Sequence, residues 1–243
     1  MESHKVVSKD EWIEARKRLL TKEKEFTRLR DQLSQQRRDL PWEAVNKEYV
    51  FEGPHGKQTL PDLFDGRSQL IVYHFMFGPG WEAGCPHCSF WADNFNDIIL
   101  HLNQRDVTMI AVSRAPYSQL AAYKKRMGWS FKWVSSSETD FNFDYHVSFT
   151  PEEMAKNAVF YNYTTQEPGA SEREGVSVFY KNAAGRVFHT YTRLVMISLS
   201  SGCVAMTNTA DRCHEDGPDS RDEPLQPRRR AAEEQRVRRD RDD

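Results

Sequence analysis

Two cysteines lie three residues apart, at Cys85 and Cys88, between an apolar run and a segment with helical periodicity. The run before them, residues 70–77, suits a buried strand, and the apolar residues 95, 98, 99 and 102 recur at helical spacing. A strand, a loop and a Cys-x-x-Cys pair that begins a helix form a typical dithiol redox arrangement. The spacing therefore indicates thiol–disulfide chemistry without naming a substrate.

Each residue from Cys85 to Cys88 has an expected role in that chemistry. The attacking species is a thiolate, and the unpaired amides at a helix N-terminus favour negative charge on Cys85. Pro86 suits the first helical position because its missing N–H is not needed there. A protonated His87 would stabilise the thiolate further. Cys88, one turn later, is expected to resolve the mixed disulfide by attacking it.

Other uses of the two thiols stay open. Buried cysteines are often inert, and a thiol peroxidase usually has a threonine three residues before its reactive cysteine, where this chain has Glu82. A zinc site needs four ligands. The remaining candidates show no ligand-pair spacing with the cysteines, and they are His74, His87, Cys203, Cys213 and His214. We therefore predict dithiol exchange, with no metal and no organic cofactor.

The elements around the cysteines predict an α/β fold. Residues 69–77 and 107–113 are continuous apolar runs, as in strands buried on both faces of a parallel sheet, and the cysteine helix lies between them. The other expected elements are a hairpin at 49–52 and 57–60, a helix at 117–129, a strand at 131–136 and a hairpin at 176–180 and 187–191. This order predicts a thioredoxin-like domain over residues 45–192.

An N-terminal extension over residues 8–40 precedes that domain. Ser8 and Glu11 form a capping-box pattern, which predicts a helix that runs to about Arg38 and ends before Pro41. One apolar stripe repeats every seven residues, at Trp12, Leu19, Phe26 and Leu33. We expect this stripe to dock on the chain's own domain, and the alternative is a short coiled-coil dimer.

Residues 140–153 are unusually aromatic, and their alternation predicts an extended segment along one edge of the sheet. The functional alternative is a lid over Cys85 that brings Tyr145 or His146 near the thiol. Thr150 and Pro151 predict the start of a short helix. The apolar neighbours of three further residues predict core positions for His74, Met76 and Met109.

Trp81 and Trp91 flank the cysteine motif and are expected to offer a partner an apolar platform. The expected partner is a disulfide-containing protein or a small thiol. A rival interpretation is a non-catalytic module that binds a partner through the N-terminal helix and the aromatic segment. The sequence does not indicate the oligomeric state.

Bulk composition limits the remaining possibilities. The net charge of −2 gives no field that would attract nucleic acid or an anionic membrane. No apolar run reaches the roughly 18–20 residues of a spanning helix, and the N-terminus lacks the apolar core of a signal peptide. Four cysteines without an export signal favour the reducing cytoplasm. Residues 193–243 change character and, from Asp211, are dominated by Arg, Asp and Glu, which predicts a disordered tail.

Five stretches carry a resemblance to a known family. They are Tyr49–Pro54, Thr59–Phe64, Tyr73–Pro79, Cys85–Asp93 and Phe149–Glu153. Together they resemble the thioredoxin-like family of domain of unknown function 899, over about residues 6–191. The resemblance implies a thioredoxin-like fold and leaves the reaction open. Thioredoxins place a proline before the strand that faces the active site, whereas the corresponding residues here are Glu174-Gly175-Val176-Ser177.

Overall fold

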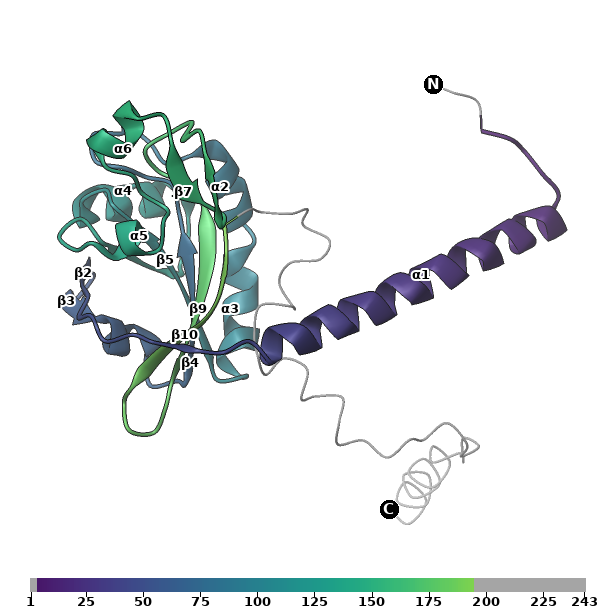
Figure 1. Cartoon of the computed structure of the whole chain (residues 1–243), viewed down its shortest axis with the longest axis horizontal. Coiled ribbons are helices and arrows are strands. Elements are labelled where there is room, and N and C mark those ends of the chain that lie inside the picture. Colours follow the sequence, from purple (N-terminus) through teal and green to yellow (C-terminus); the bar gives the residue numbers. More distant parts are fainter. Residues whose placement is uncertain (1–3, 195–243) are drawn as a thin grey trace, which may run out of the picture. The chain divides into compact units, whose positions relative to one another are not determined.

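A computed structural model describes residues 4–194 of the chain. Within this range the chain forms a mixed sheet of eight strands, which Figure 1 shows together with the helices that flank it. In spatial order the strands are β1 (Glu43–Ala44), β10 (Val187–Arg193), β9 (Gly175–Lys181), β4 (Gln69–His74), β5 (Val107–Ser113), β6 (Lys132–Ser135), β2 (Val50–Gly53) and β3 (Gly56–Thr59). A separate pair is formed by β7 (Val159–Tyr161) and β8 (Thr164–Gln166).

Strand β4 lies at the centre of the sheet and leads directly to the cysteines. It pairs in parallel with β5 on one side and antiparallel with β9 on the other. Every residue of β4 and β5 is buried, which explains their unbroken apolar runs. The strand ends at His74, three residues earlier than the apolar run predicts. Phe75 and Phe77 stay buried. The Phe75 backbone N–H donates to Val112 within β5, and the Phe77 carbonyl accepts from Ala115 after it.

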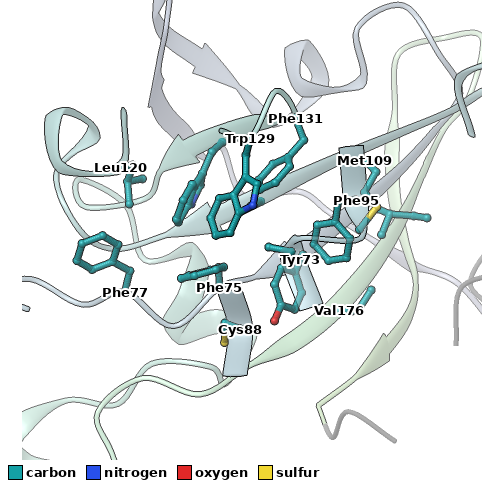
Figure 2. Close-up of a cluster of buried hydrophobic side chains, with 14 of the residues drawn as sticks. Tyr73, Phe75, Phe77, Cys88, Phe95, Met109, Leu120, Trp129, Phe131 and Val176 are labelled. Carbon is teal, nitrogen blue, oxygen red and sulfur yellow. The ribbon is translucent and has the colours of Figure 1, made fainter. Parts of the chain in front are cut away.

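Two helices follow the cysteines instead of the single one predicted. They are α2 (Pro86–Ala92) and α3 (Phe95–Asn103), and they follow one another along the sheet (Figure 1). Together with α4 (Tyr117–Met127) they cover one face of the sheet. That face holds an aromatic core that includes Phe75, Trp129 and Trp133. Figure 2 shows Cys88 at the edge of this core, near Phe75.

The opposite face of the sheet carries a second core, covered by the 3-10 helix Leu60–Phe64 and by α5 (Phe141–Asp144). His74 is completely buried there, as predicted. Its Nε2 lies 2.9 Å from the Ser177 hydroxyl, which is bonded to Thr192 and through it to His189. Burial lowers the pKa of His74 to about 3, so the ring is neutral.

The connections identify the fold. A βαβ unit is formed by β4, the cysteine helices and β5, and an antiparallel hairpin of β9 and β10 extends the sheet on the other side of β4. This combination is a thioredoxin-like fold. The predicted N-terminal hairpin is present as β2 and β3, and it joins the sheet beyond β6.

The aromatic segment after residue 140 is not extended. Residues Phe141–Asp144 form a turn of helix because the Phe141 ring is completely buried among Tyr49, Phe51 and Tyr145. The aromatic alternation in the sequence therefore does not mark a strand here. The predicted short helix after it is present as α6 (Pro151–Ala155), which the Thr150 hydroxyl caps.

Helix α1 (Lys9–Arg38) begins with the predicted capping box between Ser8 and Glu11. None of its residues is buried, so the structure does not show the expected docking on the domain. One side-chain contact places the Arg37 guanidinium 5.6 Å from the centre of the Tyr191 ring. The predicted tail begins at residue 193 and, from residue 195, lies outside the described residues. Among the described helices, none is long and apolar enough to cross a membrane.

Candidate active site

The loop after β4 holds Cys85 at the start of α2. The backbone N–H of Cys85 donates to the Met76 carbonyl at 3.0 Å, which ties the loop to the end of the strand. Gly84 is buried against the Phe75 ring, where a Cβ atom would come within 2.6 Å of the ring. Pro86 is the first helical residue, as predicted, and the Cys85 carbonyl accepts from both the backbone N–H and the hydroxyl of Ser89. The strand and helix thus fix the backbone on either side of the thiol.

The two cysteines occupy unlike environments. Cys85 is half-buried, whereas Cys88 is buried against the aromatic core, and both are free thiols. The hydrogen bond from Cys88 lowers the pKa of Cys85 to about 5, against the opposing effect of burial. The backbone N–H groups of Cys88 and His87 and the charge of His87 add smaller contributions. The same hydrogen bond, together with burial, raises the pKa of Cys88.

The pair therefore carries one negative charge and one proton. At neutral pH Cys85 is the thiolate, and Cys88 keeps its proton and shares it with its neighbour. A low pKa together with partial exposure is the mark of a reactive cysteine. Of the two, Cys85 is the one that a substrate can reach.

Tyr73 is a member of the site that the sequence did not reveal. Its side chain is completely buried, and its hydroxyl has no hydrogen-bond partner among the described residues. Figure 2 shows this hydroxyl at the same edge of the aromatic core as the Cys88 sulfur. Burial raises the pKa of Tyr73 well above its usual value, and the neighbouring Cys88 raises it further. The phenol is thus a buried donor that is held beside the second thiol.

The Cys85 thiol opens into a cleft of about 430 Å³. One wall comes from the cysteine helix and the end of β4, and the other from the loop before β9. The lining residues are Tyr73, Met76, Cys85, His87, Cys88, Trp91, Gly169, Ala170, Arg173 and Glu174. Residues 169–173 carried no motif in the sequence, because only the pairing of β9 with β4 brings them to the thiol. Glu174 lies where the family resemblance placed the residues that face the active site. Arg173 is held by the Pro168 carbonyl and lies over the Tyr161 ring.

The structure brings together most of the predicted site residues. Cys85, Cys88, His87 and Trp91 line the cleft, and His87 is exposed at its mouth. Pro86 is exposed and adjoins the cleft through its place in α2. Trp81 is half-buried against the aromatic core and is not part of the lining.

Two other expectations need correction. Met109 is a core residue, but Met76 is half-buried and lines the cleft instead. The lid alternative is wrong, because Tyr145 packs on His74 and Phe179 on the opposite face of the sheet. His146 contacts Phe160 and does not line the cleft.

The described residues hold no group of three or more side chains that could bind a metal ion. His74, one of the zinc candidates, is buried on the face opposite the cysteines. Cys203, Cys213 and His214 lie outside the described residues.

The fold and the site place this chain in the class of thioredoxin-like proteins that carry a dithiol at the start of the helix after the central strand. The chain belongs to the family described as bacterial protein of unknown function, DUF899, whose family model matches residues 1–216. None of the curated proteins matches it.

Several solved structures are similar to the chain, and they include peroxiredoxins. Peroxiredoxin Q from Xanthomonas campestris is 15% identical with a TM-score of 0.48, over 69% of this chain and 98% of that one. PrxQ from Xylella fastidiosa is 14% identical with a TM-score of 0.45, over 66% and 89%. Peroxidoxin BcpB from Mycobacterium tuberculosis is 12% identical with a TM-score of 0.42, over 60% and 80%.

Proposed function

We propose that this chain is a thiol–disulfide oxidoreductase in which Cys85 attacks and Cys88 resolves. The observation that carries the proposal is the asymmetry of the pair. The half-buried thiol has a pKa of about 5, and the buried thiol keeps its proton. In an inert pair of core cysteines both thiols would be buried and protonated, and neither sulfur would lie at a cleft as a thiolate.

The exchange proceeds in two balanced steps. The Cys85 thiolate attacks one sulfur of a substrate disulfide, the substrate S–S bond breaks, and the first substrate thiolate leaves and takes up a proton from water. Cys88 then gives its proton to water and attacks the Cys85 sulfur, the S–S bond between Cys85 and the substrate breaks, and the second substrate thiolate leaves and takes up a proton from water. Two electrons pass to the substrate, and a Cys85–Cys88 disulfide forms. Run in reverse, the same disulfide oxidises a dithiol substrate.

Tyr73 acts in the second step. Its raised pKa rules out a role as the base, because a phenol that holds its proton this firmly cannot accept another. Its hydroxyl instead donates to the Cys88 sulfur as negative charge develops there. The resting hydroxyl makes no hydrogen bond of good geometry among the described residues. Its interaction with Cys88, which lowers the pKa of that thiol, strengthens when Cys88 loses its proton before it attacks.

The cleft suits a disulfide that enters from solvent. Its volume of about 430 Å³ lies within the usual range of small-ligand sites. Met76 and Trp91 supply apolar surface, and Arg173 and Glu174 supply charge of both signs. We propose a disulfide-bonded protein loop or a small disulfide as substrate, in a reducing cytoplasm, with no part for nucleic acid, membrane, metal or organic cofactor.

The pH dependence of Cys85 alkylation tests the proposal. Stopped-flow reaction with iodoacetamide, with the site assigned by peptide mass spectrometry, should give a midpoint far below the free-thiol value of ~8.5. Cys88→Ala should raise the midpoint most, and His87→Ala should raise it less, following the order of their effects on the Cys85 pKa. An ordinary midpoint in the wild-type protein would overturn the enzyme proposal and leave a non-catalytic binding module.

A second assay separates exchange from peroxide reduction. Cys88→Ser should accumulate a mixed disulfide with glutathione disulfide, since the attacking thiol remains and the resolving one is lost. Hydrogen peroxide should oxidise Cys85 no faster than an unactivated thiolate of similar pKa. Rapid, catalytic loss of peroxide with slow disulfide exchange would instead assign the chain to the thiol peroxidases.

A further inference from the structure

The surface of helix α1 carries apolar residues, and charged residues beside them, that both recur every seven positions. Six of its large apolar side chains are between 40% and 63% exposed, and they are Trp12, Leu19, Leu20, Phe26, Leu29 and Leu33. Six large apolar residues on one isolated helix form an unusual surface for a monomer. The helix is 30 residues long, which corresponds to about four heptads and about 45 Å.

The seven-residue repeat defines a coiled-coil seam. With Trp12, Leu19, Phe26 and Leu33 at the first position of each heptad, the fourth positions are Ala15, Lys22, Leu29 and Gln36. All four first positions and two of the four fourth positions are apolar. Lys22 can lay its aliphatic stem along the seam and keep its ammonium in water.

The charges that flank the seam decide which partner fits. In a parallel two-stranded coil, the residue before each first position meets the residue five places further along the partner helix. For this chain the facing pairs would be Glu11 with Arg16, Arg18 with Glu23, Glu25 with Arg30, and Gln32 with Arg37. The first three pairs join opposite charges, and the last joins an amide and a cation. No pair is repulsive.

The antiparallel alternative lacks this complementarity. Two fully overlapping antiparallel helices would bring Glu23 against Glu23 and Arg16 against Arg30. In the single helix Arg16 and Glu23 bond to each other at 2.8 Å, with both side chains more than 40% exposed. The flanking charges thus favour a parallel pair of identical helices.

We propose that α1 is the dimerisation element of this protein and that it pairs in parallel with α1 of a second copy. The proposal rests on the heptad and its charges, so it is independent of the chemistry of the cysteines. The apolar stripe then lies between the two helices, and the polar face of each helix stays in water.

Charge reversal in the full-length protein tests this pairing. Glu25→Lys or Arg30→Glu alone places like charges together at two symmetric sites and should weaken the dimer by about tenfold or more. Mixing the two single variants should restore the dimer, because the heterodimer regains both opposite-charge pairs. Masses measured by sedimentation equilibrium across a concentration series would report each state, with 28.4 kDa for the monomer.

Lys24→Glu is the matched control, because residue 24 lies on the outer face of the heptad and should leave the dimer unchanged. Circular dichroism checks that each variant keeps its helix. A wild-type protein that stays monomeric at high micromolar concentration would overturn the proposal. The proposal would also be overturned if both charge-reversal variants dimerised as tightly as the wild type, or if a mixture of the two weakened variants formed no heterodimer.

Discussion

The two sulfur atoms of the cysteine pair have different protonation states. A thiolate at Cys85 and a thiol at Cys88 stabilise each other through one hydrogen bond, which lowers one pKa and raises the other. The reduced form therefore holds a single proton over a wide range of pH. Since a stabilised thiolate favours the dithiol, the disulfide is expected to be more oxidising than an unperturbed pair.

The reduction potential should accordingly depend on pH with an unusual slope. Between about pH 5 and 8.5 reduction takes up one proton for two electrons, so the potential should fall by about 30 mV per pH unit. Two ordinary thiols would take up two protons and give about 59 mV per unit. Equilibration with glutathione buffers at several pH values measures the slope. A slope of about 59 mV per unit up to pH 8 would contradict the assignment of the charge to Cys85.

Tyr73→Phe should slow the second step and spare the first. The variant keeps the buried ring and removes only the hydroxyl that has no partner in the described residues. A hydrogen bond to a charged group is worth roughly 1.5–3 kcal/mol, so release of the second substrate thiol should slow by about tenfold or more. Single-turnover release from a preformed mixed disulfide measures this step. The rate of Cys85 alkylation should not change.

Tyr123→Phe is the control for that variant. The Tyr123 hydroxyl bonds to Ser89 on the same helix as Cys88, at 2.9 Å, so the variant also loses one buried hydroxyl near the site. It should leave the release step unaffected. Equal slowing in both variants would show that Tyr73 acts through packing alone.

At the scale of elements, the loop between β4 and α2 depends on a glycine that is fixed by packing. A methyl group at Gly84 would lie 2.6 Å from Phe75 and 3.4 Å from Tyr123, both part of the aromatic core. Gly84→Ala should therefore lower the free energy of unfolding by about 1–3 kcal/mol, as overpacked cores do. Chemical denaturation measures the loss, and the exposed neighbour offers Ala83→Ser as the control. Equal stability of both variants would show that the loop moves to accommodate the methyl group without loss of stability.

Periodicity predicted most of the elements correctly, because their burial is visible in the sequence. The runs at residues 69–74 and 107–113 are buried on both faces, and the hairpins carry turn residues between alternating strands. It failed at Phe141–Asp144, where the short segment forms a turn of helix that buries Phe141 and Asn142 and leaves Phe143 half-buried. It also failed at Asp93–Asn94, where the cysteine helix is interrupted.

The candidate site was only half visible in the sequence. The spacing of Cys85 and Cys88 predicted both cysteines as site residues, and it also pointed to the residues next to them in the chain. Tyr73 looks like any apolar strand residue until its hydroxyl is found beside Cys88. Arg173 reaches the cleft through the pairing of two strands that are about a hundred residues apart, a contact without a local signal, whereas the family resemblance had already indicated Glu174.

For the whole molecule, the buried neutral His74 makes the free energy of unfolding depend on pH in the acid range. The unfolded ring takes up a proton near pH 6.5, whereas the folded ring does so only near pH 3. The unfolded state therefore binds more protons in that window, and stability falls as the pH drops through it. The contribution amounts to about 1.4 kcal/mol per pH unit.

His74→Gln should remove this contribution and flatten the acid side of the stability curve by that slope. Denaturation midpoints between pH 6.5 and 4 measure the difference from wild type, since the carboxylates are common to both proteins. His55 is exposed in the β2–β3 turn, so His55→Gln serves as the control. Parallel curves for wild type and His74→Gln would contradict the buried neutral ring.

The junction between α1 and the sheet has a mechanical consequence. Strand β1 is two residues long and exposed, and it is held at the edge of the sheet by Glu43 opposite His189 and Ala44 opposite Phe188. Tension applied through α1 would load these few bonds one after another, as in unzipping, while the interior strands stay paired. Strand β1 can therefore be peeled from the sheet edge by a force too small to disturb β4 or the dithiol.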